Sequence, residues 1–223
     1  METIVLSLGG SLISTGQGID HEYLKAFRDL ILQYMKRKRF AMTVGGGSIC
    51  RQYQKASDAF HASPDTKDWI GVYSTYLNAA LVCASFGGYA YPRMLFDPTK
   101  VPKTKKRLMV YAGWKPGFST DYDAARLAVS LDCRMVINLS DIDYVYDKDP
   151  KTSLDARPIK RMSWKEYAVL AGKWEPGKNM PFDPIAARLA MKNGLKVVIM
   201  NGKKLQNFRD FLDGKAFFGT TVE

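Results

Sequence analysis

Short apolar segments alternate with longer amphipathic ones along the chain, and this order predicts strands that alternate with helices. The short segments, which are typical of buried strands, cover residues 4–8, 40–44, 108–112, 134–139, 196–200 and 217–222. The longer segments carry apolar residues three or four positions apart, which predicts amphipathic helices. Four of them cover residues 21–37, 68–85, 164–171 and 204–212; two more start at about residue 49 and at residue 184, and another ends at residue 130. Asp20 is the expected N-cap of the first. This order predicts an α/β fold, a three-layer αβα sandwich around a mainly parallel sheet.

The chain is organised around residues 108–130. They start as a strand, which we interpret as the central one, turn at GWKPG and continue into an Ala-rich helix that Ser119, Thr120 or Asp121 can cap. A strand that ends in a glycine-rich turn at the start of a helix gathers free backbone N–H groups, and the helix dipole adds positive charge there. The segment therefore indicates an anion site, most often for phosphate, although a capped turn without a ligand has the same sequence.

Two further strands end in glycines. Residues 8–11 read LGGS and residues 44–48 read VGGGS, and Arg51 follows the second run by about one helical turn. Ligands of parallel α/β sheets bind at the carboxyl ends of the strands. Because all three glycine junctions lie at those ends, we expect them to converge on one edge of the sheet.

Composition sets the class of protein. The 223 residues are 46% hydrophobic and 25% charged, which is typical of a soluble globular chain with a buried core. No apolar run approaches the roughly 20 residues of a membrane span, and the N-terminus has no signal-peptide pattern. Cys50, Cys83 and Cys133 lack metal-ligand spacing and predict free thiols in a reducing compartment, with no metal held by the protein alone. These features predict a cytoplasmic protein.

The formal net charge is +11. The basic residues are dispersed, apart from clusters at 36–39 and 103–107, and no nucleic-acid-binding motif is evident. The charge therefore does not predict a nucleic acid partner, and a positive field also suits ligands that carry phosphate. Neither GxGxxG nor GxxxxGK[ST] occurs, so neither a dinucleotide-binding fold nor a P-loop is indicated.

The motifs occur in an order that resembles a known superfamily. In sequence they are LGGS, VGGG followed by Arg51, GWKPGFSTD at 113–121, SDIDYVYDKDP at 140–150, PFDPIAARLA at 181–190 and GTTV at 219–222. This set resembles the amino-acid kinase superfamily, and within it most closely the UMP kinases of archaeal and bacterial type. GWKPGFSTD followed by DYVYDKDP is the most specific part, and the resemblance covers nearly the whole chain.

This resemblance implies the amino-acid kinase fold as a single domain over residues 1–223. Residues 1–130 would form the lobe that binds the acceptor nucleotide, and residues 131–223 the ATP lobe. The implied reaction is transfer of the γ-phosphate of ATP to UMP, a step of pyrimidine biosynthesis that gives ADP and UDP without a covalent enzyme intermediate. Mg²⁺ would bridge phosphate oxygens. The resemblance also implies a homo-oligomer, commonly a hexamer built as a trimer of dimers, and no nucleic acid or membrane partner.

Matching each motif position assigns the site residues. The resemblance implies catalytic roles for Arg51, Asp183 and Gly10. It implies ATP binding by Gly9, Gly10, Gly47, Arg51, Ser140, Tyr146 and Asp149. It implies UMP binding by Gly46, Asp68, Trp114, Lys115, Pro116, Gly117, Phe118, Ser119 and Thr120. Structural roles stay open for some of them, because Asp68 can cap the helix that it opens, Tyr146 can belong to the core and Asp183 can be an N-cap.

Two departures from the superfamily pattern bear on activity. Ser7 stands where many superfamily kinases have a lysine that bridges the phosphates, so Arg51, Lys115 or Lys178 would supply that charge. The usual NVDG-like motif reads DIDY here, which places an extra carboxylate, Asp141, near the donor nucleotide. Two alternatives therefore stay open: the same fold acting on CMP, a small phosphate or a carboxylate, and a nucleotide-binding storage or regulatory protein without catalysis.

Overall fold

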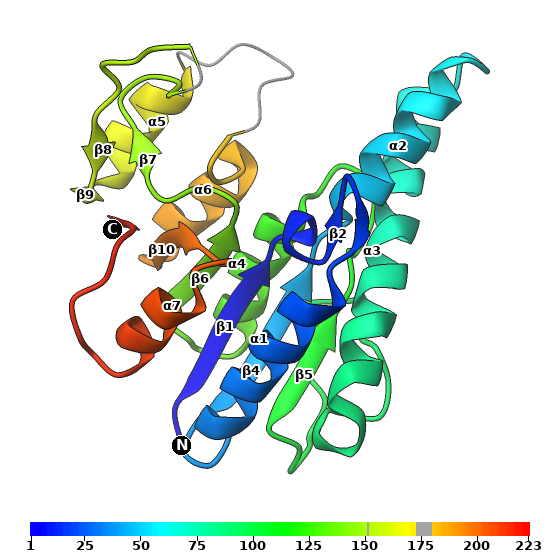
Figure 1. The fold of residues 1–223 in the computed structure, drawn as a ribbon, viewed down its shortest axis with the longest axis vertical. Coiled ribbons are helices and arrows are strands. Elements are labelled where there is room, and N and C mark those ends of the chain that lie inside the picture. The colour runs from blue at the N-terminus through cyan, green and yellow to red at the C-terminus, as the bar shows by residue number, and fades with distance from the viewer. Residues whose placement is uncertain (151, 173–179) are drawn as a thin grey trace.

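A central sheet with helices on both faces makes up the fold (Figure 1). The computed structural model describes residues 1–150, 152–172 and 180–223. Within these residues seven strands lie side by side, in the order β5 (Leu108–Tyr111), β4 (Arg39–Val44), β1 (Thr3–Leu8), β6 (Met135–Ser140), β10 (Lys196–Asn201), β11 (Thr220–Val222) and β9 (Arg161–Met162). β11 runs antiparallel to β10, and the other neighbouring pairs are parallel. The predicted α/β fold with a mainly parallel sheet is confirmed.

Strand order divides this sheet by position in the chain. β5, β4 and β1 come from the first 111 residues, whereas β6, β10, β11 and β9 come from residue 135 onward. Two short ladders lie outside the sheet: β2 (Ser14–Thr15) pairs with β3 (Gly18–Ile19), and β7 (Val145–Tyr146) pairs with β8 (Pro158–Ile159). Strands this short carry no periodic signal, and the sequence did not predict them.

Helices complete the outer layers. One face of the sheet is covered by α1 (His21–Tyr34), α3 (Pro64–Phe86) and α7 (Leu205–Leu212), and the other by α4 (Thr120–Ser130), α5 (Trp164–Gly172) and α6 (Pro184–Lys192). α2 (Gly47–Asp58) packs along α3. Two short 3₁₀ helices cover Gly10–Leu12, after β1, and Gly87–Tyr89, after α3. Alternate side chains of β1 enter the two cores, Leu6 on one face and Val5 on the other. The predicted three-layer arrangement is therefore confirmed.

Helix starts mostly follow the expected capping. Asp20, Ser119 and Asp183 each accept a hydrogen bond from a backbone N–H in the first turn of α1, α4 and α6, at 2.9, 3.2 and 3.0 Å. α3 is different, because it begins at Pro64 with Ser63 as its N-cap. The expectation that Asp68 opens and caps this helix is wrong. A serine followed by proline at the first helical position is the stronger start signal, and Asp68 lies in the second turn.

β5, which we interpreted as central, is an edge strand of the described sheet. It pairs with β4 on one side, and on the other it forms only isolated bridges with Ala90 and Leu95. The chain between these two residues runs along the edge, where the N–H groups of Tyr91 and Leu95 donate to the carbonyls of Leu108 and Val110 at 2.8 and 2.9 Å. Strand order depends on packing between distant segments, which a local pattern does not encode, so the prediction of a central strand is wrong.

α3 is a long helix rich in apolar residues. By length and composition alone α3 can cross a membrane, and it is the one such helix in the described part of the chain. The expectation that no apolar run approaches the length of a membrane span is therefore wrong for this segment. Its inner face nevertheless includes Ser74, Thr75 and Asn78, whose side chains are buried and bind backbone groups. In the most apolar window of this helix 39% is buried, and core helices of soluble proteins pass the same test of length and composition.

Candidate active site

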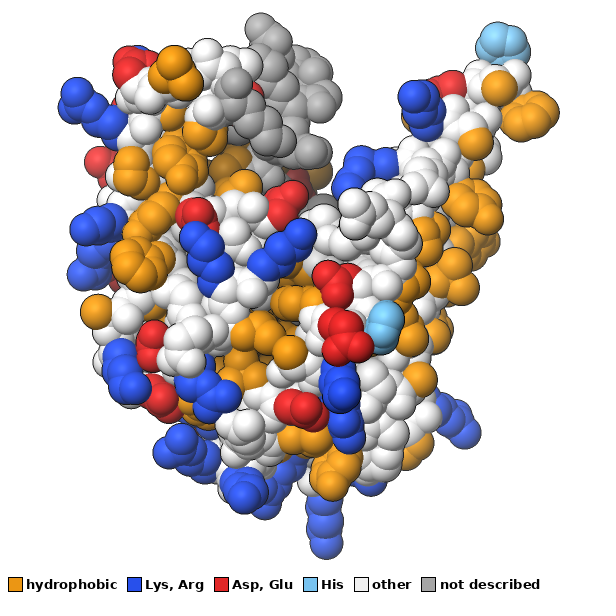
Figure 2. All heavy atoms as spheres, viewed as in Figure 1, with side chains coloured by type: hydrophobic (Ala, Val, Ile, Leu, Met, Phe, Trp, Pro, Cys, Tyr) orange, Lys and Arg blue, Asp and Glu red, His pale blue; other side chains and the backbone are white. Residues whose placement is uncertain are grey.

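A cavity of about 440 Å³ opens at the carboxyl ends of β4 and β5. It lies between the arm formed by α2 and α3 and the starts of α4 and α6, and Figure 2 shows the surface hollowed between that arm and the part of the molecule that carries α5. The residues predicted to bind UMP that line it are Gly46, Asp68, Pro116, Gly117, Phe118, Ser119 and Thr120. Asp183 also lines it. Its volume is in the range of sites for small molecules.

Five glycines, Gly9, Gly10, Gly45, Gly46 and Gly47, form what we call the glycine junction, which borders the cavity at Gly46. A Cβ on Gly10 would lie 2.2 Å from the amide nitrogen of Gly47 and 2.3 Å from the carbonyl oxygen of Gly45. Gly47 has φ of +66°, in the left-handed region that favours glycine. The ends of β1 and β4 therefore meet as bare backbone at the start of α2, where N–H groups and the helix dipole favour an anion.

The 113–120 loop connects β5 to α4 and is held by side chains at three amides. The N–H groups of residues 113, 114 and 117 donate to Thr75, Asp123 and Asp68, at 2.7, 3.0 and 3.1 Å. Thr75 and Asp123 are buried, whereas Asp68 is exposed at the border of the cavity. Hydrogen bonds to its backbone amides thus fix the loop on both sides of Pro116.

Trp114 and Lys115 belong to the loop, but in the described structure they do not line the cavity. The Trp114 ring stacks on Phe118 with centroids 5.6 Å apart, and Phe118 stacks on Tyr122 at 4.3 Å. The ammonium of Lys115 lies 4.0 Å from the centroid of the Trp114 ring, a cation–π arrangement. The charge of Lys115 is therefore held over an aromatic stack rather than beside the glycine junction.

Asp121 is the centre of a polar network under the cavity. Its carboxylate accepts hydrogen bonds from the Ser7 hydroxyl at 2.8 Å, from the Asn138 side-chain amide at 2.7 Å and from the Asp183 N–H at 3.3 Å. Burial is the main cause that raises the pKa of Asp121 to about 6, and these hydrogen bonds oppose it. Ser7 is thus tied to a carboxylate at the position where the superfamily pattern has a lysine.

Asp183 is an N-cap, and its carboxylate also bonds outside its own helix. Oδ1 accepts from the N–H of Ile185 at 3.0 Å, while Oδ2 accepts from the hydroxyl of Ser119 at 2.6 Å. The capping role considered from the sequence is confirmed. Its predicted catalytic role stays a prediction, although the same carboxylate borders the cavity.

Arg51 lies on α2, about one turn after the glycine junction, and its side chain is exposed. It does not line the cavity, and over residues 1–150, 152–172 and 180–223 its guanidinium forms no hydrogen bond or ion pair. The positive charge of Arg51 is therefore free to pair with an anionic ligand.

Three of the residues predicted to bind ATP, Ser140, Tyr146 and Asp149, belong neither to the glycine junction nor to the lining of the cavity. Ser140 ends β6, and its Cα lies 3.5 Å from where a Cβ on Gly9 would be; its buried hydroxyl has no partner among the described residues. Tyr146 is half-buried edge-on against Tyr144 and belongs to neither described core, so its alternative assignment to the core is wrong. The backbone carbonyl of Asp149 accepts from the N–H of Thr152 at 3.1 Å. Lys178 lies outside the described residues.

An ion pair next to this region was not predicted. Nζ of Lys204 lies 2.8 Å from Oδ1 of Asp143, which also accepts from the side-chain amide of Asn201 at 3.1 Å. The hydrogen bond to Asp143 is the main cause that raises the pKa of Lys204. The second carboxylate of the DIDY segment is therefore neutralised by a lysine from the loop after β10.

Comparison with known proteins assigns the family. The profile described as the amino acid kinase family matches residues 2–201. The chain belongs to this family. It is 34% identical to a uridylate kinase of Thermoplasma volcanium over 229 aligned residues, covering 100% of this chain and 98% of the relative. It is 30% identical to a uridylate kinase of Pyrococcus abyssi, covering 99% of each chain.

Solved structures of amino acid kinase fold agree with this assignment. The crystal structure of uridylate kinase from Archaeoglobus fulgidus is similar with a TM-score of 0.85 at 29% identity, over 100% of both chains. A UMP kinase structure from Ureaplasma parvum has a TM-score of 0.82 at 19% identity, over 100% of this chain and 98% of the other, and at that identity it supports the fold alone.

The sequence did not predict the side chains of α3 that bind the backbone of the glycine junction and of the 113–120 loop in this amino acid kinase. Thr75 and Asn78 lie on the buried face of α3, and the Asn78 amide donates to the carbonyl of Gly45 at 2.8 Å. A Cβ on Gly46 would lie 2.3 Å from the hydroxyl oxygen of Ser74. The available signal was a cluster of polar residues within an apolar helix, since buried polar side chains need hydrogen-bond partners.

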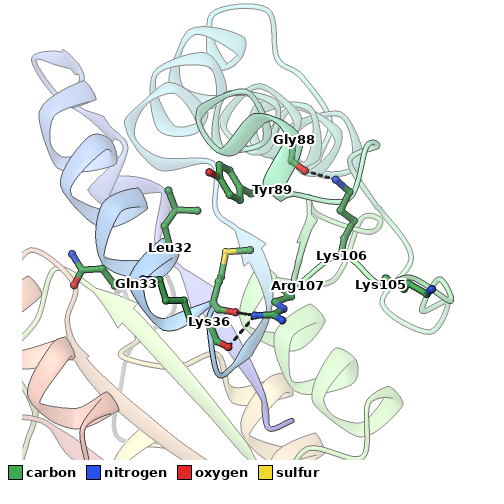
Figure 3. A pocket seen from close by; sticks show the side chains of 9 residues that line it. Leu32, Gln33, Lys36, Gly88, Tyr89, Lys105, Lys106 and Arg107 are labelled. Carbon is green, nitrogen blue, oxygen red and sulfur yellow. Dashed lines mark hydrogen bonds between the residues drawn. The ribbon is translucent and has the colours of Figure 1, made fainter.

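A larger cavity of the kinase, about 560 Å³, lies elsewhere, between the end of α1 and the segment before β5 (Figure 3). Its cations serve the fold: the Arg107 guanidinium donates to the carbonyls of Met35 and Lys36 at 2.5 and 2.9 Å, and the Lys106 ammonium donates to the carbonyl of Gly88. These bonds satisfy carbonyls at the end of α1 and after α3. The cavity lies away from every residue predicted for ATP or UMP.

Proposed function

We propose that this amino acid kinase transfers the γ-phosphate of ATP to UMP and releases UDP and ADP. The observation that carries the proposal is the 440 Å³ cavity, in which the glycine junction and the 113–120 loop come together as walls of one space. Relatives named uridylate kinase match the chain over its whole length, which supports the same reaction.

For the acceptor we propose Gly46, Asp68 and residues 114–120 as the UMP site. All of these except Trp114 and Lys115 border the cavity, and those two support its wall through the aromatic stack. Oδ2 of Asp68 holds the N–H of Gly117, so Oδ1 can accept from a ribose hydroxyl without breaking the loop contact. The hydroxyls of Ser119 and Thr120, at the start of α4, suit a phosphate.

For the donor we propose that ATP lies beyond the glycine junction, with its phosphates at Gly9, Gly10 and Gly47 and within reach of Arg51. Ser140, Tyr146 and Asp149 would hold the nucleoside. The order of strands supports a division into an acceptor lobe, residues 1–130, and an ATP lobe, residues 131–223. Asp183 comes from the second part and borders the acceptor cavity, so it would lie where the two substrates meet.

Catalysis would depend on position and charge rather than on a covalent intermediate. Gly10 lets two strand ends approach without side chains, Arg51 supplies positive charge, and Asp183 orients the hydroxyl of Ser119. Among the described residues no three His, Cys, Asp or Glu side chains gather to hold a metal ion. The phosphates of ATP supply the oxygens that Mg²⁺ prefers, so Mg²⁺ would be bound to them and neutralise their charge.

We also propose a cytoplasmic homo-oligomer, as a hexamer built from dimers. The outer face of α3 supports an interface between copies of the chain, because Trp69, Tyr73 and Leu77 form a stripe at four-residue spacing. Of their surface, 36%, 57% and 63% is exposed. Apolar stripes of this kind usually mark an interface. A second copy that presents the same stripe would cover it.

A non-catalytic nucleotide-binding protein is the second candidate, and one observation favours it. Ser7 donates to Asp121 where a lysine would bring charge to the phosphates. Arg51, on the helix that begins at Gly47, carries a charge that could replace that lysine, which favours the enzyme.

Measurement of ADP release with Mg²⁺–ATP and one acceptor at a time separates these candidates. The acceptors are UMP, CMP, isopentenyl monophosphate and acetate. The proposal expects turnover that is fastest with UMP. Calorimetric binding of ATP and UMP with no ADP formed would favour the non-catalytic protein, and faster turnover with another acceptor would change the substrate.

A further inference from the structure

Two buried side chains from opposite faces of the sheet hold the first two amides of the 113–120 loop. The N–H of Gly113 donates to Oγ1 of Thr75 at 2.7 Å, and the N–H of Trp114 donates to Oδ2 of Asp123 at 3.0 Å. Thr75 is 6% exposed on α3, and Asp123 is 0% exposed in the first turns of α4. Because α3 and α4 cover different faces, the loop is clamped where it leaves β5.

Thr75 is oriented for this contact. Its hydroxyl donates to the carbonyl of Val72 at 2.6 Å, which leaves the oxygen to accept from Gly113. The fit is close, since a Cβ on Gly113 would lie 3.0 Å from Oγ1. Thr75 also lines the cavity, so a shift of the loop relative to α3 changes the shape of the proposed acceptor site directly.

The carboxylate of Asp123 is costly to bury, and its only hydrogen bond among the described residues is to the loop. Oδ1 has no partner among the described residues, and Oδ2 accepts from Trp114. The titratable groups that face it are Asp121 on α4, Asp97 before β5 and Tyr76 on α3, and none of them is a cation. Burial first, and the two carboxylates next, raise the pKa of Asp123 to about 7, against the effect of the Trp114 N–H.

We propose that Thr75 and Asp123 are positioning residues that set the affinity for the acceptor nucleotide by fixing the start of the 113–120 loop. The proposal rests on the UMP kinase function. Residues 116–120 line the cavity, and their place depends on where the loop begins. Neither Thr75 nor Asp123 is among the residues assigned to ATP, so the effect is selective for the acceptor.

A pH dependence follows from the charge of Asp123. Its ionised form makes the stronger hydrogen bond to the Trp114 N–H, because bonds to charged acceptors are stronger than neutral ones. The KM for UMP therefore decreases as Asp123 ionises, between about pH 6 and pH 8. The second ionisation of a phosphate monoester near pH 6 also contributes. It is the same for every variant and cancels in a comparison.

The test uses the full-length protein and steady-state kinetics with UMP and Mg²⁺–ATP. Thr75→Val removes the hydroxyl and keeps the shape, Thr75→Ser keeps the hydroxyl, and Asp123→Asn removes the charge. Ser85→Ala is the matched control, because Ser85 on α3 makes the same bond to the carbonyl three residues earlier, at 2.8 Å, without touching the loop. We expect Thr75→Val to raise the KM for UMP about tenfold with the KM for ATP unchanged. Thr75→Ser should keep the wild-type KM for UMP. Asp123→Asn should remove the part of its pH dependence that Asp123 causes and leave the part that comes from the phosphate.

Unfolding midpoints measured in urea identify variants that fail to fold. The proposal is overturned if folded Thr75→Val and Asp123→Asn proteins keep the wild-type KM for UMP at every pH. It is also overturned if Ser85→Ala raises that KM as much as Thr75→Val does. If the wild type forms no UDP at all, the proposed function fails instead. In that case the dissociation constant of UMP, measured by calorimetry on the same variants, tests the two positioning residues. A higher constant for Thr75→Val than for Ser85→Ala supports the proposal, and equal constants overturn it.

Discussion

The hydroxyl of Ser119 donates to Oδ2 of Asp183 at 2.6 Å, and this bond joins the N-terminal caps of two helices. Ser119 caps α4 and Asp183 caps α6, and the two residues are 64 positions apart in the chain. Two helix starts, with their partial positive charges, are thereby brought to one wall of the cavity. The bond connects the two parts of the sequence that we assign to the two nucleotides.

Removal of this link should weaken both folding and acceptor binding. Ser119→Ala takes away a helix cap, which lowers the free energy of unfolding by about 1 kcal/mol. It also releases Asp183, so we expect the KM for UMP to rise several-fold. Ser63→Ala is the matched control, since it removes the cap of α3 at a site that does not line the cavity. Equal effects of both variants on the KM for UMP would contradict the proposed role of the link.

The glycine junction should tolerate no side chain at Gly10. A Cβ there would lie 2.2 Å from the amide nitrogen of Gly47, so the ends of β1 and β4 must separate. We expect Gly10→Ala to abolish UDP formation. Gly16→Ala is the control, because no atom lies within 4 Å of a Cβ at that position. Wild-type turnover by a folded Gly10→Ala protein would show that the junction does not shape the site.

The exposed guanidinium of Arg51 should act on the transferred phosphate. Loss of one preorganised donor at developing charge commonly lowers kcat by about 10²–10³-fold, and we expect Arg51→Ala to fall in that range. Lys55→Ala removes a cation one turn later on the same exposed helix and should leave kcat unchanged. A similar loss in both variants would indicate a general effect of charge on the helix.

The free energy of unfolding should decrease as the pH rises from about 4 to about 7. Burial raises the pKa of Asp121 to about 6 and that of Asp123 to about 7, from an ordinary value of 3.8. Between about pH 4 and pH 7 the folded chain therefore binds more protons than the unfolded chain, so the free energy of unfolding decreases with pH.

Urea unfolding at pH 5 and pH 8 measures this decrease. Asp123→Asn cannot ionise, so we expect it to lose about 1–3 kcal/mol less between the two pH values than the wild type does. Asp29→Asn, on the exposed surface of α1, is the control and should follow the wild type. The account is contradicted if wild type and Asp123→Asn lose the same free energy.

Local signals explain which parts of the fold could be predicted from the sequence. The apolar strands and the caps Ser119 and Asp183 depend on a few neighbouring residues, and the glycine runs mark strand ends directly. Ser63 and Pro64 also mark the start of α3, whereas the apolar periodicity alone predicts a start at Asp68.

Other features depend on packing between distant segments. β5 is the first strand in the order of the described sheet, and on its free side only Ala90 and Leu95 bridge to it; no local pattern shows this position. Likewise, Thr75 and Asp123 reach the 113–120 loop only because α3 and α4 pack on opposite faces of the sheet. Polar residues on the buried face of an apolar helix mark such contacts but do not identify the partner.

The central claim is that the cavity beside the glycine junction accepts UMP for phosphorylation by ATP. The most direct test incubates the purified protein with Mg²⁺–ATP and an equimolar mixture of UMP, CMP and AMP, and quantifies the nucleoside diphosphates by ion-exchange chromatography as they form. The account predicts that UDP forms first and in excess over CDP. Each transfer to UMP or CMP also releases one ADP from the donor, so phosphorylation of AMP is measured by the ADP in excess of UDP plus CDP. Formation of CDP before UDP, or of excess ADP without any UDP, would contradict the account.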